Sequence, residues 1–325
     1  MPSSRRRSSS RWPRSATSEA AVIEPPPLHF DAPPSMVWNM VRIALRGSAR
    51  STRVELPALS ATLAPQVPEA DRLAAYRAIC QTELRDTLPL AYPQLAAAAL
   101  HLALLADKRC PIGGLGLLHV RNEITRHRAL PASQAWSYSA RLASWTPVSR
   151  GHELTIETEV SDALGVAWRA TTVALARGPS KKSTADRVET RPARALDEAS
   201  KAVDSHPADS RAVWALAEDT GRRFARIAGD RNPIHLWALT ARPFGFPSAI
   251  VHGMYSLGRV LGALEAAGLP ERVTVSAAFI RPVLLPSEVV FERRTGGEGQ
   301  VDFTISSLDG ARLHVSGSAT GRLSA

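Results

Sequence analysis

The stretch Phe224-Ala225-Arg226-Ile227-Ala228-Gly229-Asp230-Arg231-Asn232-Pro233-Ile234-His235, with Val251-His252-Gly253-Met254 behind it, decides what is predicted for this 325-residue chain. Asn is a favoured helix N-cap and Pro suits the first helical position, so Asn232-Pro233 predicts a helix start. His235 then falls on the first turn, and Asp230 lies just before the cap. We expect both side chains to reach one water molecule, as acid–base chemistry requires.

The predicted helix start also suggests a charge state for each group of this pair. The positive end of a helix disfavours an imidazolium, so we expect His235 to be neutral and Asp230 to be ionised. Pro247 prevents a long helix from beginning upstream, and the pattern predicts the next helix at about 252–267. The N–H of Gly253 would then face a ligand as an oxyanion donor.

Working outward, each half of the chain shows one helix followed by several strands. The apolar run 95–106 is too short to span a bilayer and predicts a buried helix. Alternating or β-branched segments predict the strands. They are expected at 117–125, 136–142, 154–160 and 166–176, and again at 273–280, 288–293, 301–306 and 313–320. An offset of 155 residues also aligns Leu130-Pro131-Ala132-Ser133 with Leu285-Pro286-Ser287.

This weak repeat predicts an α+β fold made of two similar units, because a second copy can cover the open sheet of the first. Residues 1–35 read as a disordered basic, Pro-rich tail. An N-terminal domain is expected at 36–177 and a C-terminal domain at 208–325. Residues 178–207, rich in Lys, Ser and Arg, read as a linker.

Composition excludes several classes of protein. The net charge is +10, but Arg5, Arg6, Arg7, Arg11 and Arg14 supply half of it from the tail. Without a basic motif among aromatics, we expect no nucleic-acid binding. The two cysteines form no CxxC or metal-spaced cluster, which argues against a zinc or iron–sulfur site and favours the cytoplasm. We also expect no stable membrane insertion.

Histidines and cysteines outside the opening stretch are predicted to be structural. His101, on an apolar helix, reads as a satisfied core histidine. The two cysteines, Cys80 and Cys110, are expected to be inert. His119, His127 and His152 lie in predicted strands and read as residues on the faces of a sheet.

The opening stretch, together with Phe279-Ile280-Arg281-Pro282-Val283 and Leu285-Pro286-Ser287, resembles the MaoC-like or R-specific enoyl-CoA hydratase 2 family over residues 210–325. This resemblance implies a double hot dog, in which each unit wraps an antiparallel sheet around a long helix. It also implies roles for individual residues. Asp230 and His235 match the catalytic pair, Gly253 the oxyanion donor, and Asn232, Pro233 and His252 the supporting residues.

The first half lacks this motif, since the offset of 155 places Asp230 and His235 on Ala75 and Cys80. We therefore expect one active site per chain, with the first half shaping the acyl pocket. The activity implied by the resemblance is reversible hydration of trans-2-enoyl-CoA to (R)-3-hydroxyacyl-CoA, a hydro-lyase reaction without metal or redox cofactor. CoA would be the substrate's carrier.

Other functions remain open at this point. The chain could be a 3-hydroxyacyl-ACP dehydratase of fatty-acid or polyketide synthesis, or a non-catalytic acyl-thioester-binding protein. A thioesterase is less favoured because the hydratase-type turn is present. A homodimer is one arrangement that stays open, although two repeats already pair within the chain.

Overall fold

The alternating segments of both halves form one continuous sheet in the computed structural model, which describes residues 26–46, 55–114, 116–177 and 208–321. The strands are β1 Leu28–Phe30, β2 Ser60–Gln66, β3 Leu117–Arg126, β4 Trp136–Val148, β5 Gly151–Asp162, β6 Gly165–Arg177, β7 Ser210–Leu216, β8 Val273–Phe279, β9 Ser287–Thr295, β10 Gln300–Ser307 and β11 Leu313–Thr320. Their order in the 11-stranded sheet is β1-β2-β4-β5-β6-β3-β8-β11-β10-β9-β7.

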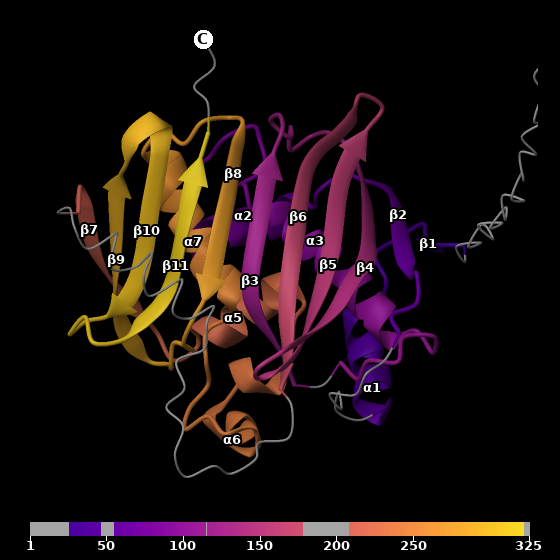
Figure 1. Ribbon diagram of the computed structural model, residues 1–325. Helices are drawn as coiled ribbons and strands as arrows, with labels where there is room; N and C mark the ends of the chain where they lie inside the picture. Colours follow the sequence, from indigo (N-terminus) through magenta and orange to yellow (C-terminus); the bar gives the residue numbers. More distant parts are fainter. Residues whose placement is uncertain (1–25, 47–54, 115, 178–207, 322–325) are drawn as a thin grey trace, which may run out of the picture.

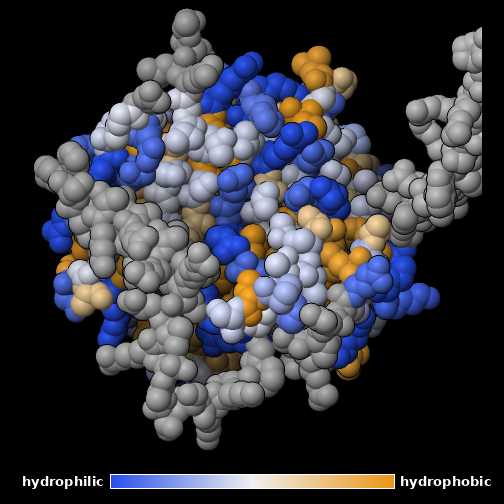
Figure 2. Space-filling model, viewed as in Figure 1, coloured by the Kyte–Doolittle hydropathy of each residue, from blue (hydrophilic) through white to orange (hydrophobic). Residues whose placement is uncertain are grey.

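The helices lie together on one side of this sheet, as Figure 1 shows. They are α1 Met36–Arg46, α2 Ala70–Cys80, α3 Tyr92–Ala106, α5 Thr220–Ala228, α6 Ala238–Ala241 and α7 Gly253–Ala266, with short 3-10 turns η1 Pro233–His235, η2 Arg242–Phe244 and η3 Gly297–Gly299. Hydrophilic and intermediate residues cover much of the opposite face of the sheet, where apolar residues form only small groups (Figure 2). The main core therefore lies between the sheet and α3 and α7.

The two halves repeat one topology. The first half has the order β2-β4-β5-β6-β3, and the second has β7-β9-β10-β11-β8, which is the same path through equivalent strands. The halves join where β3 and β8 pair in antiparallel fashion, so each closes an edge that the other would expose. Each half contributes one long central helix, α3 or α7, of 15 and 14 residues. The predicted α+β double hot dog is confirmed.

The repeat is not uniform along the chain. β2 begins at Ser60 and β7 at Ser210, an offset of 150 residues, whereas α3 begins at Tyr92 and α7 at Gly253, an offset of 161. The difference comes from the long connection between α5 and α7, which carries η1, α6 and η2. The predicted offset of 155 lies between these two values. Residues 229–235 of the opening stretch belong to this long connection.

One part of the predicted tail is ordered. Residues 28–30 form β1, which pairs in parallel with β2 through Leu28 and Ala61. The prediction of disorder over 1–35 is therefore wrong for this segment, because main-chain pairing to a sheet edge compensates for the lack of an apolar pattern. Residues 1–25 and the predicted linker 178–207 lie outside the described residues, and the proposed domain limits stay predictions.

The two cysteines and the lengths of the helices bear on two further predictions. Cys80 and Cys110 are both buried and unpaired, and burial raises the pKa of the Cys80 thiol to about 12, so this thiol stays protonated. Among the helices described, none is long and apolar enough to cross a membrane.

A buried ion pair ties the halves together. Arg126 on β3 donates from Nη1 to Glu265 Oε1 on α7 at 2.9 Å, and both side chains are about nine-tenths buried. The backbone N–H of Leu90 also donates to Glu265 Oε1. Removing one partner of a buried pair leaves an uncompensated charge, whose cost exceeds that of losing a surface contact.

Glu265→Ala is therefore expected to lower the free energy of unfolding by about 3–5 kcal/mol. The matched control is Glu157→Ala, which breaks the exposed pair with Arg141 and should cost about 0–1 kcal/mol. Urea unfolding followed by tryptophan fluorescence measures both. Equal losses in the two variants would contradict the importance assigned to the buried pair.

Candidate active site

The turn that carries Asp230 begins where α5 stops. Gly229 is the C-cap of α5 with φ +80°, a left-handed conformation that favours glycine. A side chain at this position would also meet Met36 Sδ at 2.5 Å. Earlier in α5, a Cβ on Gly221 would clash with the carbonyl oxygen of His235, so the helix and the turn approach closely only because this residue is glycine. These two glycines set the path of the turn.

Asn232 and Pro233 shape the turn as predicted. The Asn232 side chain accepts from the N–H of Ile234 at 3.4 Å, and Pro233 opens η1. The backbone N–H of Asn232 donates to Asp230 Oδ1 at 3.1 Å, which fixes one carboxylate oxygen, and Asp230 lines the cavity. Asn232 therefore positions Asp230 as well as capping the turn.

His235 is held in one ring orientation. Its Nδ1 lies 2.8 Å from the carbonyl oxygen of Ile250, so Nδ1 carries the proton and donates. In a neutral ring the lone pair is then on Nε2. One side-chain nitrogen or oxygen atom from each of Asp230, His235 and His252 lies within 4.8 Å of the other two. A carboxylate and an imidazole acceptor thus stand close enough to share one small molecule.

His252 packs directly on His235. The two rings stack with centroids 3.6 Å apart and an interplanar angle of 23°. His252 Nε2 donates to the backbone carbonyl of Asp230 at 3.2 Å, while its distance to the Asp230 carboxylate is 3.9 Å, which is too long for a hydrogen bond. His252 therefore supports the position of the His235 ring and of the Asp230 backbone.

Burial keeps both histidines neutral. Desolvation lowers the pKa of His235, opposed by the nearby Asp230 charge and the bond to Ile250. Desolvation also lowers the pKa of His252 well below its ordinary value, and the neighbouring His235 adds to this effect. The predicted neutral state of His235 agrees with this direction, but the cause is burial rather than the dipole of η1, which is only three residues long.

Gly253 is the first residue of α7, so its N–H has no acceptor within the helix. It lines the same cavity as Asp230 and His235. A Cβ at this position would lie 3.1 Å from the ring of Phe279, which limits the space beside the N–H. The structure thus places the first N–H of α7 in the cavity that Asp230 and His235 also line, and the role predicted for Gly253 stays a prediction.

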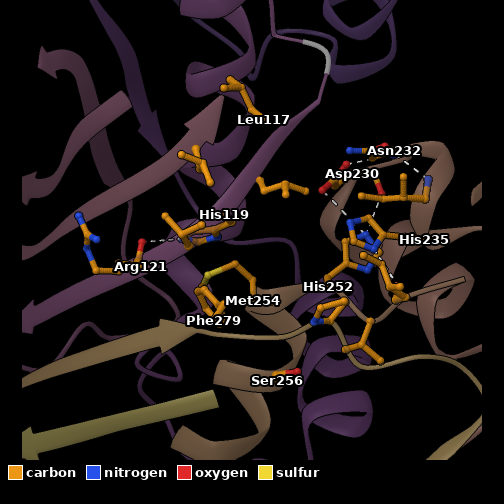
Figure 3. Close-up of a pocket in the computed structure, with 18 of the residues that line it drawn as sticks. Leu117, His119, Arg121, Asp230, Asn232, His235, His252, Met254, Ser256 and Phe279 are labelled. Atoms are coloured by element: carbon orange, nitrogen blue, oxygen red, sulfur yellow. Dashed lines mark hydrogen bonds and ion pairs between the residues drawn. The ribbon is translucent and has the colours of Figure 1, made fainter. Parts of the chain in front are cut away.

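The cavity has a volume of about 570 Å³ and is built by both halves. Figure 3 shows Asp230, His235 and His252 on one side, with Leu117 and His119 of β3 opposite. The first half also contributes residues from α3, β5 and β6 to its lining. The first half therefore forms part of the pocket wall, in line with the prediction that it shapes this pocket.

Sequence reasoning missed His119. It was expected on the face of a sheet, but it lines the cavity, and its ring lies 4.8 Å from that of Phe279. His101 is hydrogen-bonded to Thr158 at 2.8 Å, as a satisfied core histidine should be, yet it also lines the cavity. The offset of 155 makes Ala75 the equivalent of Asp230 and Cys80 the equivalent of His235. Both residues lie on α2, and neither lines this cavity.

A metal ion is a poor fit to this cluster. Asp230, His235 and His252 could each offer one ligand atom. However, the two imidazoles stack face to face, so their lone pairs lie in nearly parallel planes and cannot both point at one tetrahedral ion. His235 Nδ1 and His252 Nε2 are also committed to backbone carbonyls.

The absence of a metal therefore stays a prediction with a direct test. Incubation with EDTA followed by gel filtration is expected to leave turnover unchanged. Loss of activity that returns on adding Zn²⁺ would contradict it.

Several known proteins are similar to this chain. Residues 187–315 match the family described as MaoC like domain, a match that begins inside the predicted linker. The chain is 28% identical over 289 residues to 3-hydroxyacyl-thioester dehydratase X of Mycobacterium tuberculosis, covering 89% of this chain and 99% of that protein. The crystal structure of HtdX from the same organism superposes with a TM-score of 0.67 at 27% identity, covering 81% of this chain and 100% of that one.

A structure with lower sequence identity has the same fold. A MaoC-like dehydratase from Phytophthora capsici has a TM-score of 0.62 at 15% identity, covering 84% of this chain and 97% of the other, which shows a shared fold. The family match covers the half that carries Asp230, His235 and Gly253, and the fold match covers both halves. Residues 187–315 thus match a MaoC-like domain, and the chain shares its two-repeat fold with a MaoC-like dehydratase.

Proposed function

We propose that this protein catalyses the reversible hydration of trans-2-enoyl-CoA to (R)-3-hydroxyacyl-CoA, as a hydro-lyase. One observation carries the proposal: Asp230, His235 and the helix-start N–H of Gly253 line the same cavity. Addition of water to an enoyl thioester needs both an acid–base pair and a donor for the thioester oxygen. The similarity to a 3-hydroxyacyl-thioester dehydratase supports the reaction class.

In this mechanism the Gly253 N–H donates to the thioester carbonyl oxygen. Polarisation of the carbonyl makes C3 electrophilic and stabilises the negative charge that develops on the oxygen. Water held between Asp230 and His235 adds its oxygen to C3 while it gives up one proton. His235 can accept at Nε2, because its Nδ1 proton is held by Ile250. A proton is returned to C2, and the reverse sequence eliminates water.

The mouth of the cavity suits an anionic carrier. Arg150, Arg177 and Arg281 line the cavity and are exposed. Cationic side chains raise the local concentration of anionic ligands, which fits the phosphates of CoA. An acyl-ACP is also anionic, so this charge supports a carrier-bound thioester and leaves the ACP-dependent dehydratase as the alternative.

The test is a panel of trans-2-enoyl-CoA esters of increasing chain length, with loss of enoyl absorbance as the readout and chiral analysis of the product. Formation of the (R)-3-hydroxyacyl ester is expected. The same acyl chains on ACP, compared by kcat/KM, separate the two carriers. Binding of every ester without turnover would instead favour a non-catalytic acyl-thioester-binding protein, and thiol release would indicate a thioesterase.

Gly253→Ala is expected to lower kcat by about 10²-fold or more, because the added Cβ meets Phe279 and shifts the donor from the carbonyl oxygen. Gly297→Ala is the matched control, since a Cβ there meets nothing within 4 Å. Steady-state kinetics on one enoyl-CoA ester measure both variants. A Gly253→Ala enzyme with unchanged kcat would remove Gly253 from the mechanism.

The cellular location and the oligomeric state are also part of the proposal. A cytoplasmic location is proposed from the two unpaired cysteines, and fractionation of the producing cell tests it. A homodimer remains an arrangement to be measured by sedimentation equilibrium at several protein concentrations.

A further inference from the structure

A buried polar cluster lies in the half of the chain that lacks the acid–base motif. It consists of Gln94 on α3, His119 and Asn122 on β3, and Thr172 on β6. Gln94 Nε2 donates to Thr172 Oγ1 at 3.0 Å, and Asn122 Nδ2 approaches the same oxygen at 3.2 Å. Gln94, Asn122 and Thr172 are 4%, 2% and 7% exposed, so the cluster is screened from bulk water.

The cluster borders the cavity of the proposed active site. Gln94, His119 and Thr172 are lining residues of that cavity. Gln94, Ala98 and His101 line it from α3 at positions i, i+4 and i+7, which lie on one face of a helix. Asn122 and Thr172 are direct partners across β3 and β6, so their side chains lie on the same face of the sheet. Helix and sheet thus present polar groups to one another at the cavity wall.

The polar groups of this cluster do not satisfy one another. Gln94 Oε1 is buried without a hydrogen-bond partner. One end of the Asn122 amide lies 3.2 Å from both Thr172 Oγ1 and His119 Nε2, and the other end is buried without a partner. Thr172 has a single hydroxyl proton to donate, so it cannot satisfy both amides whichever way each amide is turned. Buried polar groups in folded proteins are normally paired, and an unpaired one calls for an explanation.

His119 offers another acceptor beside these amides. Its Nε2 lies 3.0 Å from the carbonyl oxygen of Arg121, so that nitrogen carries the proton and Nδ1 holds the lone pair. Burial lowers the pKa of His119 to about 4, with the Arg121 hydrogen bond and the Asp230 charge opposing the shift. The ring is therefore neutral near pH 7, and its sensitivity to Asp230 places the cluster within electrostatic reach of the acid–base pair.

A plain alkyl chain would leave Gln94 Oε1 and the lone pair of His119 Nδ1 without a partner. A hydroxyl group would not, because it both donates and accepts and so can pair with either end of an amide. We propose that the pocket takes acyl thioesters whose chain carries a hydroxyl group beyond the reacting carbons, bound by Gln94 with Thr172 and His119. This inference rests on the proposed function and specifies its substrate class.

The test compares trans-2-enoyl-CoA esters of one chain length: the unsubstituted ester and a series with a single hydroxyl at successive carbons beyond the double bond. At one position kcat/KM is expected to exceed that of the unsubstituted ester by about ten-fold or more, because a site built for a hydroxyl discriminates against its absence. The corresponding saturated esters, which cannot react, should show the same preference in Kd.

Variants assign the preference to the cluster. Gln94→Leu and Thr172→Val should each bring the values for the hydroxylated and unsubstituted esters together, whereas Leu95→Met, an apolar change in the same wall, should keep their ratio. Tm values identify any variant that fails to fold, and the wild-type Kd comparison stands without the variants. No preference at any position, or a preference that survives in folded Gln94→Leu and Thr172→Val, would overturn the inference. Absence of turnover on every ester would contradict the proposed function instead.

Discussion

His235→Ala and Asp230→Asn are each expected to lower kcat for enoyl-CoA hydration by about 10²–10⁴-fold, the range that acid–base groups contribute. His235 presents Nε2 as a proton acceptor only because Ile250 holds the proton on Nδ1. Asp230 keeps one oxygen bound to the N–H of Asn232 and the other available to water. Loss of either group leaves the water without one of its two partners.

The double variant should be little slower than the worse single variant, because two groups that act on one water are not additive. Asp302→Asn and His127→Gln are the matched controls, since both residues lie outside the cavity. Turnover is followed by enoyl absorbance, and circular dichroism checks that each variant is folded. Near-normal kcat in a folded Asp230→Asn and His235→Ala would exclude this pair as the catalytic residues.

Much of the fold could be predicted because its elements have strong local patterns. The helix expected at 252–267 is α7, Gly253–Ala266, and the strand expected at 117–125 is β3, Leu117–Arg126. β2 was missed because Pro65 interrupts its alternation, although the strand still pairs with β4 through Ala61 and Leu63. β1 was missed because three residues beside prolines form a strand only when an edge is available.

The site could be predicted only where its residues are close in sequence. Asp230, Asn232 and His235 share one turn, whose chemistry is local. His119 comes from the other half, and β3 is irregular between His119 and Arg121. An irregular register breaks the alternation from which the facing side of a residue is counted, so its approach to the cavity could not be deduced from the strand pattern.

The neutral state of His235 illustrates the same limit. A sequence-based argument from the helix start gave the correct direction for its pKa, yet the structure assigns the shift mainly to burial. Burial arises from Ile234, Ile250 and the stacked His252, which long-range packing brings together. Local rules can thus give a correct charge state while the physical cause is tertiary.

The fold is expected to lose stability steeply between about pH 6.5 and pH 4, the interval in which its buried histidines resist protonation. Burial lowers the pKa of His101 to about 3 and that of His119 to about 4. In the unfolded chain each would titrate near its ordinary value of about 6.5. Below that pH the unfolded state binds more protons than the folded state, so the free energy of unfolding falls as the pH falls.

Each such histidine contributes a slope of about 1.4 kcal/mol per pH unit within its own window. Urea unfolding at intervals from pH 7.5 to pH 4.5 measures the total. His101→Gln should reduce the slope by about one histidine's share, whatever its effect on stability at pH 7.5.

The slope separates this effect from a general weakening of the core. A cavity or a lost hydrogen bond in His101→Gln would lower stability by a similar amount at every pH, because neither involves a proton. A change in proton uptake alters only the pH dependence. If the His101→Gln and wild-type curves run parallel from pH 6.5 to pH 4.5, His101 is not kept neutral by the fold, and desolvation does not govern the charge of the cavity wall.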